Sequence, residues 1–180
     1  MVERHLSERT KKEILSWMKS AAIALLLAIL IRQFLYTPVT VSGQSMEPTF
    51  ENDNRVVITK IHSIDRFDMI VFHSPISDEN FIKRVIGLPG DIVVMKDDHL
   101  YVNGIEYEEE YVQENKDKIY EGHRLTENFE VRVPAGHYFV LGDNRQYSMD
   151  SRMLGPIEKQ AIIGKVSFRI YPLSSIGIPR

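Results

Sequence analysis

The 180-residue chain contains no cysteine. This absence excludes a disulfide framework, a thiol nucleophile, an iron–sulfur cluster and a zinc site built from thiolates. The chain also lacks the glycine-rich loops that cradle phosphates, and its six histidines include no HExxH spacing. We therefore expect no metal and no cofactor, so that any chemistry has to come from hydroxyl, amine, imidazole or carboxylate groups.

A strong excess of one charge is missing as well, since the net charge is −3 at pH 7. This balance gives no electrostatic reason to expect nucleic acid as a partner. The charges are unevenly distributed, however. Residues 1–36 carry a net charge of +3, and residues 37–180 carry a net charge of −6. A basic head and an acidic body therefore have to be interpreted separately.

Long hydrophobic runs are scarce, and the most apolar segment, Ser20–Ile31, has only twelve residues. The core of a bilayer needs about 20 residues of helix. The wider segment 14–36 contains only Lys19 and Arg32 as charged residues, one near each end, where long basic side chains can reach the membrane interfaces. Three interpretations compete: a buried core helix, a cleaved signal peptide and an uncleaved membrane span.

We favour the uncleaved span. A helix that is apolar on all sides needs a larger core to cover it, and Arg32 and Gln33 stand where a cleavage site requires small residues. Basic residues precede the apolar segment, and none lies between Arg32 and Arg55, which predicts a cytoplasmic N-terminus and an exported body. The expected organisation is a cytoplasmic segment over 1–13, an anchor in the cell membrane over 14–36 and an extracytoplasmic domain over 37–180.

The body is rich in short runs of β-branched and aromatic residues that turn residues separate. Asn103-Gly104 predicts a β-hairpin, and the only helical pattern is a short one near 157–161. The segment 106–127 is unusually charged and predicts a solvated region, with a purely structural role, in an insertion over about 97–130. We expect a mainly β fold, with a single N-terminal transmembrane helix followed by an all-β domain that carries a small β insertion. Strands are predicted over residues 38–42, 55–60, 68–73, 81–87, 92–96, 99–102, 107–109, 130–133, 138–141 and 161–171.

Ser45 is a candidate nucleophile because of its local sequence. A β-run ends at Ser42, Gly43 frees the backbone, and Pro48 prevents a regular helix. A serine on such a turn exposes its hydroxyl beside free backbone N–H groups. Acyl transfer requires both, as the attacking oxygen and as donors to the developing oxyanion. The alternative is an ordinary surface turn with a capping serine.

Lys83 is unusual because it lies in an otherwise apolar β-run. On a strand, Phe81, Lys83 and Val85 share one face, and desolvation on that face lowers the pKa of the amine. A lysine whose pKa falls to about 7–8 is a good general base at neutral pH. The alternative is a lysine whose stem packs on Phe81 while its ammonium reaches solvent. Arg84 points to the opposite face and is expected to form a structural ion pair.

A loop rich in polar residues follows the β-run that ends at Leu141. Its charged side chains can fix the loop through charge-assisted hydrogen bonds. Its serines offer neutral hydroxyls, which can orient an amine without raising its pKa. The residues concerned are Asp143, Arg145, Ser148, Asp150, Ser151 and Arg152.

Taken in order, the blocks SGQSMEPT, FIKRVIGLPGD and VPAGHYFVLGDNRQYSMDSRMLG resemble the bacterial type I signal peptidases. These are membrane serine proteases that remove signal peptides from exported proteins. The resemblance covers the predicted anchor and most of the body, and the small size and single predicted span are similar to the short Gram-positive type. It implies a Ser/Lys dyad in which Ser45 is the nucleophile and Lys83 the general base, with no histidine in the mechanism.

The resemblance also implies supporting roles around the dyad. Ser148 matches the serine that hydrogen-bonds the base lysine, and Asp150 and Arg152 match residues that support its loop. The Ser45 backbone N–H is implied as one oxyanion donor. Gly43 stands where some members carry a serine that supplies the second donor, so this donor is not identified. Asp143 and Arg84 match positions that pair structurally, and the implied substrate-binding residues are Val39, Val41, Ser42, Met46, Phe81 and Ile82.

The implied activity is removal of signal peptides from exported preproteins after small residues, at Ala-x-Ala sites. The peptide is expected to add as an extended strand beside residues 39–42 and 81–83. Its implied partners are signal peptides, the lipid bilayer and the translocation machinery. Two alternatives have other functions: a self-cleaving Ser/Lys regulator, and a membrane-tethered β domain that binds exported peptides without catalysis.

Overall fold

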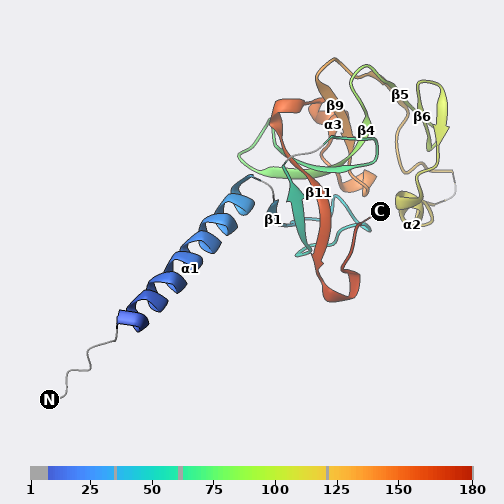
Figure 1. The fold of residues 1–180 in the computed structure, drawn as a ribbon. Coiled ribbons are helices and arrows are strands. Elements are labelled where there is room, and N and C mark those ends of the chain that lie inside the picture. The colour runs from blue at the N-terminus through green and yellow to red at the C-terminus, as the bar shows by residue number, and fades with distance from the viewer. Residues whose placement is uncertain (1–7, 35, 61–62, 121, 180) are drawn as a thin grey trace.

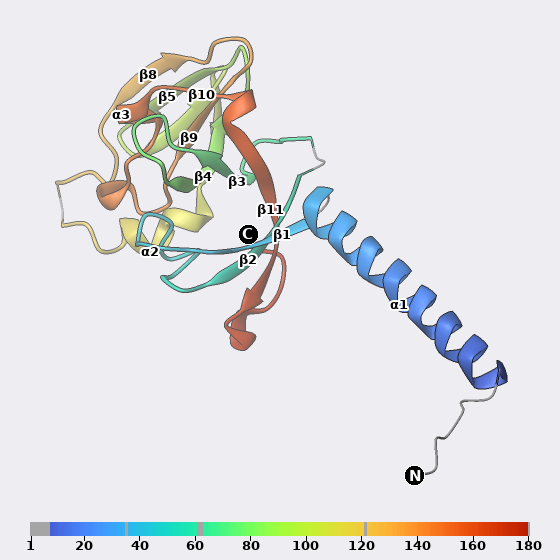
Figure 2. The same cartoon turned by 90° about the vertical axis from the view of Figure 1, so that its left-hand side faces the viewer.

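The computed structural model of the protein describes residues 8–34, 36–60, 63–120 and 122–179, and only the backbone of residues 8–9 and 30–34. An N-terminal helix, α1 (Glu8–Phe34), precedes a body of antiparallel strands. Figures 1 and 2 show α1 projecting away from this body. Its large apolar side chains are exposed, among them Trp17, Leu25 and Leu26, so α1 is not the buried core helix considered as an alternative.

In the part of the chain that the structure describes, no helix is long and apolar enough to cross a membrane. The prediction of a membrane-spanning helix over 14–36 is therefore not supported. Lys19 interrupts the apolar part of the continuous helix α1, and the uncharged stretch Ser20–Ile31 that follows is shorter than the roughly 20 residues a bilayer core needs. The predicted segment 1–13 lies partly outside the described residues.

The larger sheet of the body has seven strands in the order β1-β2-β11-β3-β4-β9-β10. Both faces of its centre are buried. In β3, Met69 and Val71 enter one apolar cluster, while Ile70 and Phe72 enter another on the opposite face. A strand with two buried faces explains why this part of the sequence is apolar without alternation. The strands are β1 (Tyr36–Thr40), β2 (Arg55–Thr59), β3 (Met69–His73), β4 (Asn80–Gly87), β9 (His137–Leu141), β10 (Ile157–Glu158) and β11 (Ile162–Tyr171).

The smaller sheet has four strands in the order β7-β6-β5-β8. A two-residue turn joins β6 to β7, and both Asn103 (φ 53°) and Gly104 (φ 81°) adopt the left-handed conformation that this hairpin turn requires. The strands are β5 (Ile92–Lys96), β6 (His99–Val102), β7 (Ile105–Tyr107) and β8 (Phe129–Arg132). The short helices of the body are η1 (Glu110–Val112), α2 (Gln113–Lys116), η2 (Arg145–Tyr147), α3 (Ser151–Leu154), η3 (Lys159–Ala161) and η4 (Leu173–Ser175).

The expectation of a mainly β fold is confirmed, and every predicted strand corresponds to an observed one within about two residues. The prediction of a short helix near 157–161 is only partly right. Ile157 pairs with Tyr138 in β10 and packs into an apolar cluster, so tertiary contacts select a strand there, and only Lys159–Ala161 forms a helical turn.

Candidate active site

Ser45 lies on a tight turn that follows β1. Gly43 has φ 86°, and the Glu47 N–H donates to the Gln44 carbonyl at 3.1 Å, which closes the turn. Met46 anchors this turn because its side chain is buried in a cluster with Phe50 and Val56. The Ser45 hydroxyl is consequently held half-buried at a fixed place, and no hydrogen bond among the described residues uses the Ser45 N–H.

Lys83 reaches the same place from the middle of β4. Its side chain is 3% exposed, and Nζ donates to Ser45 Oγ at 2.7 Å and to the Ile82 carbonyl at 3.0 Å. Nζ also lies 5.3 Å from the centre of the Phe81 ring. Burial lowers the pKa of Lys83 from its usual 10.5 to about 8, although Asp150 and Asp143 raise it in part. The pKa shift expected from the apolar β-run is therefore confirmed, and its ammonium does not extend into solvent.

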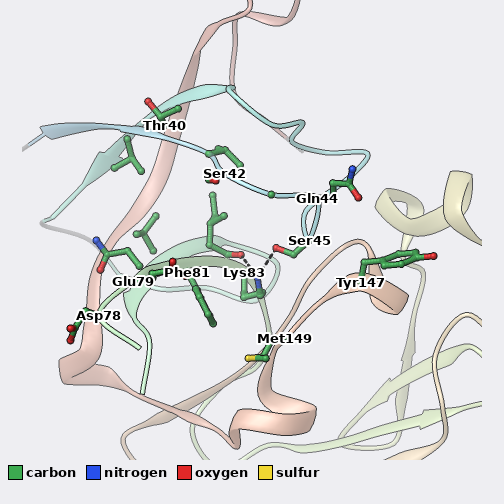
Figure 3. Close-up of a pocket in the computed structure, with 16 residues that line it drawn as sticks. Thr40, Ser42, Gln44, Ser45, Asp78, Glu79, Phe81, Lys83, Tyr147 and Met149 are labelled. Atoms are coloured by element: carbon green, nitrogen blue, oxygen red, sulfur yellow. Dashed lines mark hydrogen bonds between the residues drawn. The ribbon is translucent and has the colours of Figure 1, made fainter. Parts of the chain in front are cut away.

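A cleft of about 630 Å³ runs past these two side chains (Figure 3). Its walls come from residues 39–45 and from residues 78–83, and Val71 lies between them. β1 is the first strand of the large sheet, and β4 pairs with β9 only from Arg84 onward. Within the described strands, β1 and the first half of β4 thus both leave an edge unpaired at this cleft.

The implied substrate-binding residues divide into two groups. The cleft is lined by five of them, Val39, Val41, Ser42, Phe81 and Ile82. Met46 is different, because its side chain is 1% exposed and packs in the core. The structure therefore places Met46 in the core and not in the cleft, unlike the other five residues. Its neighbour Ser45 faces the cleft, and in a tight turn the next side chain points inward.

Ser148 lies beside Ser45 and Lys83 without the hydrogen bond to Lys83 that the resemblance implies. Its hydroxyl is buried and has no partner among the described residues. Gly142 packs directly against it, and a Cβ at Gly142 would collide with Ser148 Oγ and with the Ser45 carbonyl oxygen. Sequence reasoning missed Gly142, although its place between a buried strand and the polar loop was visible in the sequence.

Asp150 and Arg152 close the polar loop behind Ser148. Arg152 donates to Asp150 through Nε and Nη2, both at 2.8 Å, and also to the Arg145 carbonyl at 2.7 Å. Asp150 in turn accepts from the N–H of Gly142 at 3.0 Å and caps α3. These bonds connect both ends of the loop to each other.

Two buried ion pairs stabilise the segments around Ser45 and Lys83. Arg84 binds both carboxylate oxygens of Asp143, at 2.9 and 2.7 Å, and its guanidinium stacks 3.9 Å from the centre of the Tyr111 ring. Arg145 binds Glu109 at 2.5 Å, with both side chains 1% exposed. Because Glu109 and Tyr111 belong to the segment 106–127, the interpretation of that segment as a solvated region is only partly right.

Comparisons with known proteins agree with this fold. The sequence matches the family described as "Signal peptidase, peptidase S26" over residues 14–171. It is 41% identical over 179 residues to Signal peptidase IB of Staphylococcus aureus strain COL, covering 91% of this chain and 93% of that protein. It is 42% identical over 176 residues to Signal peptidase I P of Bacillus subtilis subsp. natto, covering 94% and 95%. The crystal structure of a signal peptidase I from Enterococcus faecalis V583 superposes with a TM-score of 0.58 at 38% identity, covering 59% of this chain and 99% of that one.

The β fold and these relatives define the chain as a serine peptidase, a hydrolase. It belongs to the signal peptidase family, peptidase S26, and is a signal peptidase of type I.

Proposed function

We propose that the chain is an endopeptidase that removes N-terminal signal peptides from exported preproteins with Ser45 as nucleophile and Lys83 as general base. The observation that carries this proposal is the 2.7 Å contact between Lys83 Nζ and Ser45 Oγ at the wall of an open cleft. A nucleophile and its base need this distance for direct proton transfer. The pKa of about 8 on Lys83 supports the same roles, since it keeps a useful neutral fraction near pH 7.

In the first step, neutral Lys83 accepts the hydroxyl proton of Ser45 while Ser45 Oγ attacks the carbonyl carbon of the scissile peptide bond. The C–N bond then breaks, and Lys83 returns the proton to the leaving amine, which becomes the N-terminus of the mature protein. Water attacks the resulting acyl-Ser45 ester, Lys83 takes a proton from that water, and Ser45 regains its hydrogen. Lys83 is neutral again at the end, so the cycle needs no metal or cofactor.

The Ser45 N–H serves as one donor to the negatively charged oxygen that forms at the attacked carbonyl. The Ser45 N–H is available for this role because it donates to no acceptor among the described residues. We assign Ser148, Asp150 and Arg152 supporting roles, with Ser148 next to the dyad and the Asp150–Arg152 pair fixing its loop.

The substrate lies as an extended strand between the unpaired edges of β1 and of the first half of β4. Side chains of an extended peptide alternate, so the residues one and three positions before the cleaved bond point the same way. Val39, Val71 and Ile82 present small apolar surfaces in the cleft and leave room for alanine.

Cleavage should therefore depend on small residues at the first and third positions before the bond. For a purified preprotein with Ala-x-Ala, we expect replacement of the last alanine by phenylalanine to lower kcat/KM by at least about 100-fold, since a bulky side chain cannot enter the site. Phenylalanine at the middle position is the matched control and should change kcat/KM little. Mass spectrometry of the products locates the cut, and equal cleavage of both substrates would contradict the proposal.

We further propose that α1 attaches the peptidase to a lipid bilayer, its natural partner surface. Exposed apolar side chains occupy every position of α1 from residue 21 to residue 29, and exposed apolar area of this kind indicates an interaction surface. The full-length chain should float with liposomes in a density gradient. Replacing Leu25, Leu26 and Leu27 by lysine should leave it at the bottom of the gradient. Flotation of this variant as efficiently as the wild type would exclude α1 as the attachment site.

A further inference from the structure

The side-chain amide of Asn115 connects the two loops that carry the active site. Asn115 is half-buried in α2, within the insertion over about 97–130. Its Nδ2 donates to the Glu47 carbonyl at 2.9 Å and to the Asp143 carbonyl at 3.1 Å. Glu47 ends the turn that holds Ser45, and Asp143 lies next to Gly142, against which Ser148 packs. One amide group thus bridges these two loops.

These bonds close a ring of contacts that includes the nucleophile. The Asn144 N–H donates to the Ser45 carbonyl at 3.1 Å, and the Asn144 side chain donates to the Gln44 carbonyl at 3.1 Å. Asn115 joins the same two loops through Glu47 and Asp143, and Thr49 Oγ1 donates to Asp143 Oδ2 at 2.6 Å, so the loops are tied at three separate points. A turn that is held at several points cannot rotate about any one of them.

The ring is also tied to the strand that carries the base. The Asp143 carboxylate binds Arg84, which is the neighbour of Lys83 on β4. Asp143 therefore contacts β4 through its side chain and Asn115 through its carbonyl. The relative position of Ser45 and Lys83 depends on this chain of bonds as well as on their own contact.

α2 is itself fixed to the rest of the molecule. Lys116 Nζ donates to the Asp98 carbonyl at 2.8 Å, and Val112 just before α2 is fully buried. The Glu109–Arg145 ion pair joins the insertion to the polar loop a few residues away. Asn115 consequently projects from a rigid support, as a residue that sets a distance must.

We propose that Asn115 is a positioning residue for the Ser45–Lys83 pair, an inference that rests on the proposed function. Through this amide, the insertion holds the turn that carries Ser45 at a fixed position relative to Lys83. Asn115 does not line the cleft, so it influences the chemical step and not the binding of the peptide. A small misplacement of reacting groups lowers the rate steeply.

The test is steady-state cleavage of a preprotein by the full-length chain over pH 6–10. Asn115→Ala should lower kcat by about 10- to 100-fold on the high-pH plateau. KM should stay within about twofold, because only positioning changes. The pH at half-maximal activity should not move, because the variant alters no charge near Lys83. Gln113→Ala is the matched control, since Gln113 is exposed on the same helix and, among the described residues, its amide bonds only to Asp117.

Asn115→Asp separates hydrogen bonding from packing, because it keeps the shape of the side chain but presents no amide donor to the two carbonyls. We expect its plateau kcat to fall at least as far as that of Asn115→Ala. Full activity of Asn115→Asp, or wild-type kcat in a folded Asn115→Ala protein, would overturn the inference. A fall that appears only as a raised KM would do the same.

Ser45→Ala in the same assay distinguishes a failure of the proposed function from a failure of the role assigned to Asn115. If Ser45→Ala still cleaves, the proposed function is wrong and the role of Asn115 falls with it. If Ser45→Ala is inactive while Asn115→Ala retains wild-type kcat, the dyad stands and only the inference about Asn115 is refuted.

Discussion

Ser45→Ala should abolish preprotein cleavage and leave the protein folded. Removal of the nucleophile from a serine peptidase lowers kcat by on the order of 10⁴- to 10⁶-fold. The fold should tolerate the change because Met46 and Phe50 hold the turn, whereas the Ser45 hydroxyl bonds only to Lys83 among the described residues. The free energy of unfolding should fall by only about 1–3 kcal/mol, because buried Lys83 Nζ loses one acceptor and keeps the Ile82 carbonyl. Cleavage is measured on a purified preprotein, and stability by denaturant unfolding.

Ser77→Ala provides the matched serine control. Ser77 is exposed in the segment before β4 and does not line the cleft, so its replacement should leave both kcat and KM at wild-type values. Substantial cleavage by a folded Ser45→Ala protein would mean that another group attacks the peptide bond. The proposed dyad would then have to be abandoned.

Much of this fold was predictable because its signals are local. Alternation, β-branched residues and turn pairs such as Asn103-Gly104 depend on neighbours in the sequence, and the strands followed them closely. The depressed pKa of Lys83 was also predictable, because apolar neighbours that indicate its burial, such as Phe81, lie in its own strand. The helix predicted at Ile157 was wrong because pairing with a distant residue, Tyr138, decides its conformation.

Side-chain direction in irregular segments could not be predicted in the same way. Met46 lies next to Ser45 in sequence, yet a tight turn sends the two side chains in opposite directions. Contacts between residues far apart in the sequence could not be predicted either. The partners of Glu109 and Asn115 lie 36 and 68 residues away, so a charged segment that appeared solvated supplies buried contacts to the active site. The space around Ser148 depends on Gly142, whose close approach to Ser45 only three dimensions reveal.

Activity of the wild type should rise with pH through a midpoint near 8. Only the neutral amine of Lys83 can accept the proton of Ser45, and a pKa of about 8 leaves roughly one molecule in ten in this form at pH 7. Lys83→Arg should be inactive throughout, because a guanidinium stays protonated in this range. Lys118→Met is the control, since Lys118 is exposed and, in the part of the chain that the structure describes, its ammonium pairs only with Glu114. A wild-type profile that still rises steeply at pH 10 would contradict a depressed pKa.

Lys83→Met should likewise be inactive, and it should be more stable than the wild type. Below pH 8, Lys83 is protonated in both the folded and the unfolded chain, but only the folded chain buries the charge. The difference between a usual pKa of 10.5 and one of about 8 corresponds to a destabilisation of about 3 kcal/mol. Methionine has a similar length and no charge, so the folded variant avoids this loss.

The pH dependence of the stability that Lys83→Met gains over the wild type identifies the cause of this gain. Between pH 8 and 10.5 the folded wild type releases the proton of Lys83 while the unfolded chain keeps it, so wild-type stability rises with pH. The advantage of Lys83→Met should therefore be about 3 kcal/mol at pH 6.5 and should shrink steadily towards pH 10, as measured by denaturant unfolding at both values. A constant advantage would point to better packing instead. Loss of activity together with this pH-dependent gain would show that the protein sacrifices stability to keep a lysine in the state that a general base requires.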